Sequence, residues 1–305
     1  MRAGRVTVVE VGPRDGLQNE QGFVPTDAKI AFVDALSAAG LPVIEVTAFV
    51  SPKAIPQLAD GEDVFRRVAQ RPGVRYAVLV PNVKGLERAE AVGVREIAVF
   101  TAASETFNLR NINASIEESF VRFAPVIGRA KAGGMRVRGY VSCAFGCPYE
   151  GRGAPEAAAR VAARLAAAGC DEISVGDTIG IGVPSQVPEV VGRAVEAGVP
   201  LDRLALHFHD TRGTALANVT EGLRAGVRIF DSSAGGLGGC PFAPGAAGNV
   251  ATEDLLYLLH GMGHETGVDL PAVVEASRSL SMAIGRRPVS RVYQALDGDA
   301  ARRSV

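Results

Sequence analysis

DSSAGGLGGCPFAPGAAGNVATEDLLYLL, residues 231–259, begins as a strand, continues as a glycine-rich loop and ends with the apolar spacing of a helix. Six glycines and Cys240 fall between positions 235 and 248. Glycine loses more conformational freedom on folding than any other residue, so a loop this rich in it indicates that the backbone lies close to a ligand or moves over it. We therefore predict a functional loop between a strand and a helix. A surface linker that carries a stray cysteine is the alternative.

The same order of strand and helix recurs along the chain. Runs rich in β-branched residues predict strands at 6–11, 43–49, 75–80, 96–101, 136–142, 172–177, 204–209 and 228–232. Alanine-rich runs predict helices after them at 26–39, 62–70, 85–91, 116–132, 155–168, 188–197, 216–225 and 252–259. Glycine follows several of these helices, as in AAG at 38–40 and EAG at 196–198, where a left-handed C-cap favours it.

Eight strand–helix repeats without an interrupting linker predict an α/β fold, the (β/α)8 TIM barrel. An open doubly wound sheet is the alternative, but GPRDGLQ (12–18), which follows the first strand, lacks the GxGxxG pattern typical of such sheets. A chain of 305 residues fits one barrel. We expect a single catalytic domain over 1–305, with the barrel at about 5–265 and a short C-terminal helical extension at about 266–305, in which 270–284 has helical spacing.

The composition is that of a soluble globular protein, with 47% hydrophobic and 21% charged residues and a formal net charge of −1. This balance gives no reason to expect a nucleic acid or an anionic membrane surface as a partner. The first residues, MRAGRVTVVEVG, enter a strand pattern without the apolar core of a signal peptide, and no apolar run reaches transmembrane length. We therefore expect a cytoplasmic protein whose four cysteines are reduced thiols.

Active sites of TIM barrels lie at the carboxyl ends of the strands and in the loops that follow them. Polar side chains of this chain gather at those positions. They are Arg14, Asp15 and Gln18 after the first strand, Glu45 in the second, Asp177 at the end of the sixth, His207 and His209 in the seventh, and Cys240 and Asn249 after the eighth. We therefore expect the functional site at this rim.

Two histidines of this set predict a metal site. His207 and His209 are two residues apart on a strand, so their rings project to the same face. Two adjacent imidazole rings repel each other when both are protonated, and their nitrogens need bonding partners when the rings are neutral. A metal ion bound by both rings keeps them neutral and serves as that partner. Asp15 offers a carboxylate and Asn249 an amide oxygen, which together describe an octahedral site for Mg²⁺ or Mn²⁺, with zinc as an alternative. Asp177 can equally cap the turn that follows it.

In these segments the sequence resembles the 3-hydroxy-3-methylglutaryl-CoA lyase family, metal-dependent carbon–carbon lyases on a TIM barrel. The resemblance extends from VEVGPRDGLQNE (9–20) to GNVATEDLLYLL (248–259). Matching segments between them are IEVTAFVSPKAIPQLAD (44–60), ASETFNLRNINASIEESF (103–120), YVSCAFGCPYEG (140–151), EISVGDTIGIG (172–182) and LHFHDTRGTALAN (206–218). GLGGCPFAPGAAGN (236–249) is the most discriminating, because related barrel synthases and aldolases share the Arg-Asp, Glu and HxH elements without this cysteine loop.

The resemblance implies a retro-Claisen reaction that cleaves 3-hydroxy-3-methylglutaryl-CoA to acetoacetate and acetyl-CoA. By resemblance, Asp15, His207, His209 and Asn249 are the ligands of the divalent cation. The cation would contact the tertiary hydroxyl of the substrate and make it easier to deprotonate.

The other rim residues also take roles from the resemblance. Arg14 would face the thioester oxygen, where enolate charge develops. Cys240 would be the general acid that protonates the enolate carbon, since a thiol of ordinary pKa is mostly protonated at neutral pH. Glu45 and Asp177 would orient groups or relay protons, and Gln18 would lie in or next to the site. A buried acid held by Arg14 is the alternative for Glu45.

The substrate and partners follow from the same resemblance. We expect an acyl-CoA substrate, with Lys53, Lys84 and Arg110 as candidates for the CoA phosphates, and a homo-oligomer of two or four chains. NLRNIN (108–113) and the Pro241-Phe242 pair depart from the family pattern, so a lyase for a bulkier 3-hydroxy-3-alkylglutaryl-CoA is an alternative. The cysteine loop argues against a Claisen-type synthase or a pyruvate-releasing aldolase. The complete set of metal ligands argues against an acyl-CoA-binding barrel with a vestigial site.

Overall fold

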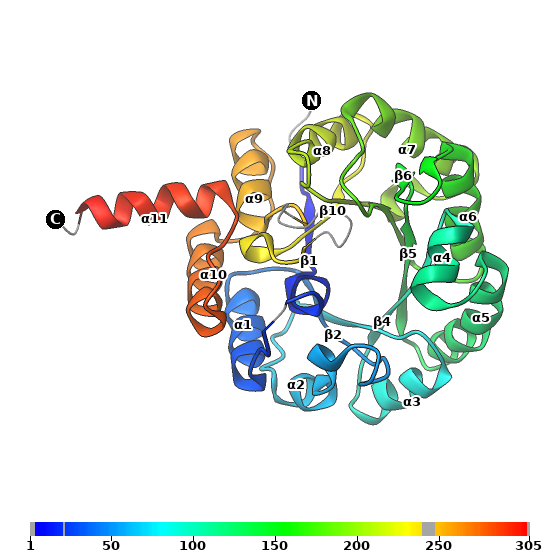
Figure 1. The fold of residues 1–305 in the computed structure, drawn as a ribbon, viewed down its shortest axis with the longest axis horizontal. Coiled ribbons are helices and arrows are strands. Elements are labelled where there is room, and N and C mark those ends of the chain that lie inside the picture. Colours follow the sequence, from blue (N-terminus) through cyan, green and yellow to red (C-terminus); the bar gives the residue numbers. More distant parts are fainter. Residues whose placement is uncertain (1–3, 21, 240–247, 304–305) are drawn as a thin grey trace.

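The computed structural model describes residues 4–20, 22–239 and 248–303 and places eight parallel strands in a closed barrel (Figure 1). The strands follow one another around the barrel in chain order, and β10 closes it against β1. The predicted (β/α)8 barrel is confirmed. The barrel strands are β1 (Thr7–Glu10), β2 (Val43–Ala48), β3 (Arg75–Leu79), β4 (Glu96–Ala102), β5 (Arg136–Ser142), β8 (Glu172–Asp177), β9 (Leu204–Phe208) and β10 (Ile229–Ser232).

Helices cover the outside of the barrel (Figure 1). The predicted helices correspond to α1 (Thr26–Ala38), α2 (Gly61–Arg67), α3 (Val83–Ala91), α5 (Ile116–Ala132), α6 (Pro155–Ala167), α7 (Val187–Glu196), α8 (Ala215–Arg224) and α9 (Thr252–Gly261). Local sequence sets several of their starts. Ser115 and Glu118 form a capping box at α5, and the Asn82 side chain accepts a hydrogen bond from Gly85 N at α3.

Helix α4 (Glu105–Ile112) and a short hairpin lie where no regular structure was predicted. Helix α4 follows β4, begins with the Ser104 side chain accepting from Phe107 N and ends at Asn113 with φ 49°. It buries too few of its residues to show helical periodicity in the sequence. A hairpin of β6 (Gly146–Cys147) and β7 (Gly151–Arg152) follows β5. Helix α11 (Arg291–Arg303) lies within the predicted helical extension, after its predicted helix, α10 (Leu270–Ile284).

The barrel has an apolar shell and a charged interior. Large side chains such as Phe65, Phe123 and Phe230 are buried in the shell between strands and helices. Residues of the same strands that alternate with the apolar ones face the barrel interior. There Arg138, with 1% of its surface exposed, lies 2.8 Å from Oε1 of Glu172 and 2.6 Å from Oδ1 of Asp231. TIM barrels usually fill this space with branched apolar side chains, so a buried ion-pair network under the rim is a property of this chain.

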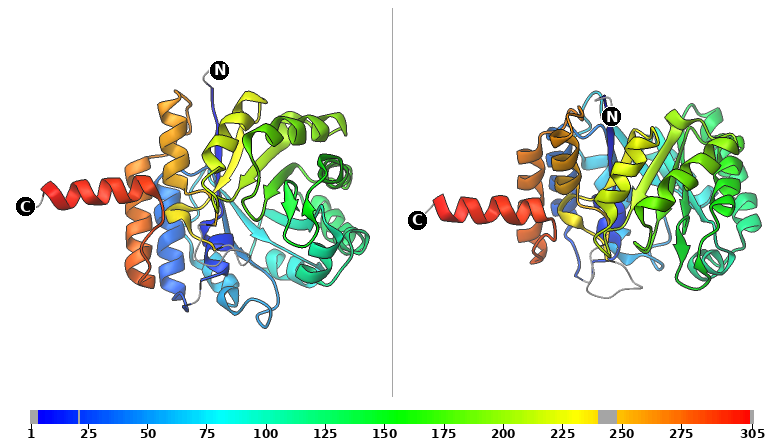
Figure 2. Two further views of the ribbon diagram at one scale, coloured as in Figure 1. Left: turned by 45° about the horizontal axis from the view of Figure 1, so that its top comes forward. Right: turned by 90° about the horizontal axis from the view of Figure 1, so that it is seen from above.

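The C-terminal extension packs against the first and last repeats. Helix α10 lies beside α1 and α9, and α11 projects away from the barrel (Figure 2). The carboxylate of Asp254 on α9 accepts from the backbone N–H groups of Arg291 and Val292 and thus fixes the start of α11. Within the described residues, no helix is both long enough and apolar enough to cross a membrane.

Candidate active site

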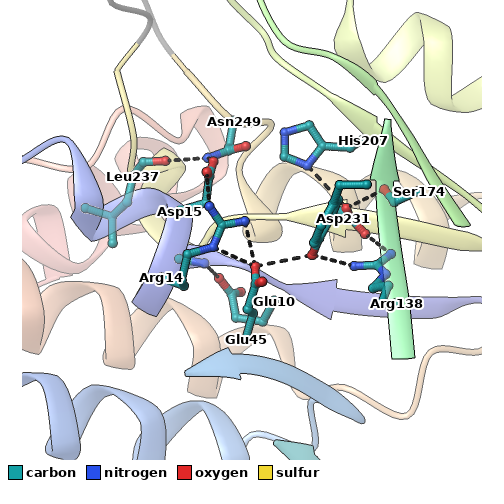
Figure 3. Close-up of polar contacts among 12 residues, drawn as sticks. Glu10, Arg14, Asp15, Glu45, Arg138, Ser174, His207, Asp231, Leu237 and Asn249 are labelled. Carbon is teal, nitrogen blue, oxygen red and sulfur yellow. Dashed lines mark hydrogen bonds and ion pairs between the residues drawn. The ribbon is translucent and has the colours of Figure 1, made fainter. Parts of the chain in front are cut away.

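The loop after β1 carries Arg14 and Asp15 to the barrel rim. It forms one π-helical turn, η1 (Gly12–Gly16), in which the N–H groups of Arg14, Asp15 and Gly16 all point to the carbonyl oxygen of Val11, at 3.2, 2.8 and 3.2 Å. π-Helical turns are rare and recur at functional sites. Figure 3 shows the Arg14 side chain reaching Glu45 of β2 and the Asp15 side chain beside Asn249.

Asp15, His207 and His209 come together at the rim. Each offers one ligand atom, and these atoms lie within 4.8 Å of one another. The two imidazole rings are 5.2 Å apart between centroids. Burial, together with the neighbouring His207, lowers the pKa of His209 to about 3, so its ring is neutral and can donate a lone pair to a metal. Burial opposes ionisation of Asp15, but Arg14 and the imidazoles lower its pKa to about 2.

Asn249 completes this group. Its side chain is 2% exposed, and its Nδ2 donates to Oδ2 of Asp15 at 2.9 Å and to the Leu237 carbonyl at 3.2 Å (Figure 3). Its Oδ1 is buried and has no hydrogen-bond partner among the described residues. Buried acceptors are nearly always satisfied, so this oxygen is available to a ligand at the site. One carboxylate, the neutral His209 ring, the neighbouring His207 ring and an amide oxygen without a partner in the described chain fit a divalent cation.

Arg14 is held from two sides by carboxylates. Its guanidinium donates to Oε2 of Glu45 from Nε at 2.9 Å and pairs with Oδ1 of Asp15 at 2.7 Å. Burial would lower the pKa of Arg14, but these two carboxylates raise it above its ordinary value, so the side chain stays charged. Glu45 also accepts from the Tyr140 hydroxyl at 3.2 Å, and burial raises the pKa of Glu45 despite Arg14. A cation is therefore fixed beside the candidate metal site.

The interior network reaches the site through Asp231, which sequence reasoning missed as a functional residue. Its Oδ2 lies 3.2 Å from Nδ1 of His207 and accepts from the Ser174 hydroxyl at 2.8 Å, while its Oδ1 pairs with Arg138. Nε2 of His207 is thereby left for a metal. Burial would lower the pKa of His207, but Asp231 raises it. The pairing of Asp231 with His207 across β10 and β9 is the signal that could have revealed this contact.

The remaining candidates have different surroundings. Asp177 is fully buried, and its two oxygens accept from Ile181 N at 3.1 Å and Gly182 N at 2.8 Å, which are the contacts of the turn-capping interpretation. Gln18 is partly buried, and its Oε1 has no partner in the described part of the chain. Cys240 lies outside the described residues. The candidates for the CoA phosphates, Lys53, Lys84 and Arg110, are exposed, and the Arg110 guanidinium lies over the Tyr149 ring.

Comparison with known proteins identifies the family. The model of the HMGL-like family matches residues 5–280. The mitochondrial hydroxymethylglutaryl-CoA lyase of Rattus norvegicus is 54% identical over 95% of this chain and 89% of its own length, and a cytoplasmic 3-hydroxy-3-methylglutaryl-CoA lyase of the same species is also 54% identical, over 95% of this chain and 84% of its own length.

Solved structures give the same result. The hydroxymethylglutaryl-CoA lyase of Pseudomonas aeruginosa has a TM-score of 0.95 and 52% identity, covering 97% of this chain and 99% of that chain. A lyase from Acinetobacter baumannii in complex with coenzyme A and 3-methylmalate has a TM-score of 0.90 and 40% identity, covering 95% of each chain. The chain therefore belongs to the HMGL-like family, as its resemblance to the 3-hydroxy-3-methylglutaryl-CoA lyases predicted.

Proposed function

We propose that this chain cleaves 3-hydroxy-3-methylglutaryl-CoA to acetoacetate and acetyl-CoA with a divalent cation, Mg²⁺ or Mn²⁺, held by Asp15, His207, His209 and Asn249. The observation that carries the proposal is the convergence of three ligand atoms within 4.8 Å beside the unpartnered Oδ1 of Asn249. The relatives named as hydroxymethylglutaryl-CoA lyases support the substrate. Mg²⁺ and Mn²⁺ are favoured over zinc because two of the four donors are oxygens.

The reaction needs a base for the tertiary hydroxyl, a positive group at the thioester oxygen and an acid at the enolate carbon. A divalent cation bound in this site supplies Lewis acidity, which makes a hydroxyl that contacts it easier to deprotonate. Glu45 has one oxygen, Oε1, without a hydrogen-bond partner among the described residues, so it is our candidate to receive the hydroxyl proton. Asp177 and Gln18 are our further candidates for relaying protons or orienting groups at the rim.

Arg14 is placed to stabilise the charge that develops when the carbon–carbon bond breaks. The bond's electron pair moves onto the acetyl-CoA fragment as an enolate, whose oxygen would face the guanidinium. Because Glu45 and Asp15 already orient Arg14, little reorganisation is needed at the moment of reaction. We assign the final proton transfer, from a thiol to the enolate carbon, to Cys240.

The wider assignments are also proposals. An acyl-CoA is the substrate class, supported by the coenzyme A complex of the Acinetobacter baumannii lyase, with Lys53, Lys84 and Arg110 as candidates for its phosphates. We propose that residues 1–305 act as one catalytic unit, that the chain forms a homodimer or homotetramer, and that it works in the cytoplasm, as the name of the second Rattus norvegicus relative indicates for that protein.

A turnover screen tests the proposed function. The full chain with Mg²⁺ is incubated with 3-hydroxyglutaryl-CoA thioesters that differ only in the alkyl group at the third carbon, and acetyl-CoA and the keto acid are quantified. We expect the highest kcat/KM for the methyl compound. A higher kcat/KM for a longer alkyl group would identify a bulkier 3-hydroxy-3-alkylglutaryl-CoA as the substrate. Condensation of acetyl-CoA with a 2-oxo acid, without cleavage of any thioester, would contradict the lyase assignment.

A further inference from the structure

The candidate metal ligands come from loops at opposite ends of the sequence. Asp15 lies in η1, directly after β1, and Asn249 lies near the end of the segment that connects β10 with α9, residues 233–251. We call this segment the β10–α9 loop. Strands β1 and β10 pair side by side, so the two loops leave the barrel next to each other. A metal site built from both requires their relative positions to be fixed.

Glu10, the last residue of β1, contacts both loops. Its side chain is 0% exposed. Oε1 accepts from the backbone N–H of Gly12 at 2.8 Å and from that of Ala234 at 2.9 Å. Oε2 accepts from the hydroxyl of Thr252 at 2.6 Å. One carboxyl group therefore joins the start of η1 to the start of the β10–α9 loop and to the first residue of α9.

The surroundings of Glu10 leave it little freedom. A Cβ atom on Gly12 would lie 2.6 Å from Oε1 of Glu10, so the glycine allows the close approach of the carboxyl group. Burial raises the pKa of Glu10 to about 8, despite the three hydrogen bonds that lower it. In either protonation state Oε1 still accepts from both N–H groups, so the link between the loops does not require the charge.

A second buried carboxylate provides a comparison within the same region. Glu253 on α9 is also 0% exposed, and it accepts from Gly235 N at 2.9 Å and from the Ser277 hydroxyl at 2.5 Å. These contacts join the β10–α9 loop to α10. Glu253 thus resembles Glu10 in burial and in the loop it holds, but its contacts lead to the extension, and those of Glu10 lead to η1.

We propose that Glu10 is a positioning residue that sets the distance between Asp15 and Asn249 by joining Gly12, Ala234 and Thr252. This inference rests on the proposed function, because it concerns the affinity of the same metal site. A site whose ligands are held in place before binding avoids the cost of ordering two loops when the metal arrives.

The affinity for Mn²⁺ alone tests the inference. The metal-stripped full chain is titrated with Mn²⁺, and free Mn²⁺ is followed by electron paramagnetic resonance. We expect Glu10→Ala to raise the Kd about 10- to 100-fold, the usual effect of removing a group that orients metal ligands. We expect Glu10→Gln to retain most of the affinity, because the amide oxygen still accepts from Gly12 and Ala234 and the amide nitrogen donates to Thr252. Glu253→Ala should raise the Kd much less than Glu10→Ala while lowering Tm.

The outcomes separate the inference from the proposed function. No Mn²⁺ binding by the unmodified chain would contradict the metal site itself. Binding by the unmodified chain with an unchanged Kd in Glu10→Ala would overturn only the inference. An equal loss in Glu10→Gln and Glu10→Ala, or in Glu253→Ala and Glu10→Ala, would also overturn it. If Glu10→Ala does not fold, Thr252→Val decides, because it removes one link to the loop: a raised Kd supports the inference and an unchanged Kd overturns it.

Discussion

Oδ2 of the buried Asp231 lies 3.2 Å from Nδ1 of His207 on the neighbouring strand. Asp231 is fixed in turn by Arg138 and Ser174. A carboxylate at Nδ1 selects the tautomer that leaves Nε2 for a metal and raises the basicity of the ring. The charged interior of the barrel therefore prepares one side of the proposed metal site.

Asp231→Asn tests this relationship. The amide has a single acceptor oxygen to share among His207, Arg138 and Ser174, so we expect the Kd for Mn²⁺ to rise about 10- to 100-fold. Arg138 also loses one of its two charged partners and keeps Glu172, so Tm should fall. Ser174→Ala is the matched control, because it removes a hydrogen bond to the same Oδ2 but leaves the contact with His207. Equal Kd values for Asp231→Asn and the unmodified chain would contradict the account.

Arg14→Lys separates charge stabilisation from metal binding. Lysine keeps the charge but cannot bind Glu45 and Asp15 with the planar geometry of a guanidinium. We expect kcat to fall about 10²- to 10³-fold, the usual effect of losing a donor at a developing oxyanion, with a smaller change in Mn²⁺ affinity. Arg67→Lys, at an exposed ion pair, should leave kcat unchanged. A wild-type kcat for Arg14→Lys would exclude the assigned role.

Cys240→Ser tests the proton donor. A hydroxyl is a far weaker acid than a thiol, so turnover should fall by about two to four orders of magnitude while Mn²⁺ and substrate affinity are retained. The measurement is single-turnover cleavage of 3-hydroxy-3-methylglutaryl-CoA. Cys147→Ser is the matched control, since Cys147 is buried beside Ser104. If Cys240→Ser turned over at the wild-type rate, another group would have to protonate the enolate.

Stability should depend on pH through Glu10. Its pKa is about 8 in the folded chain, against an ordinary value of 4.5. Between these two pH values the folded chain retains a proton that the unfolded chain has released, so the free energy of unfolding falls as pH rises through this window and levels off above it. The amide introduced by Glu10→Gln cannot titrate. We expect the decrease in Tm from pH 5 to pH 8.5 to be smaller in that variant, by about 2 °C or more, in thermal unfolding scans.

A larger decrease in Tm from pH 5 to pH 8.5 in Glu10→Gln than in the unmodified chain would contradict the raised pKa of Glu10. Glu253, whose pKa burial raises to about 7, contributes a decrease of the same sign in both proteins, so it does not affect the comparison. Glu253→Gln is a second test, with a flatter profile below about pH 7.

Much of the fold could be predicted because its signals are local. β-Branched runs predicted strands whose ends agree with the structure to within about two residues, as at Arg136–Ser142 and Glu172–Asp177. Glycines marked the ends of several helices. The site residues that the structure brings together, Asp15, His207, His209 and Asn249, are polar groups at strand ends, where the barrel topology alone directs attention.

The remaining residues could not be found in this way because their contacts depend on strand register. Asp231 and Arg138 contact each other across the barrel, 93 residues apart in sequence, and no local pattern specifies that pair. Glu10 lies among valines in a strand, and only the positions of Gly12, Ala234 and Thr252 around it give it a role. Helix α4 is short and mostly exposed, so its periodicity was too weak.

Metal dependence of turnover tests the central claim most directly. The full chain is stripped of metal, Mn²⁺ is added in steps, and acetoacetate formed from 3-hydroxy-3-methylglutaryl-CoA is measured at each step. The account predicts no turnover before addition, a linear rise, and saturation at one Mn²⁺ per chain, with the rise abolished in His209→Ala. Turnover by the stripped chain, or an unchanged titration in His209→Ala, would contradict it.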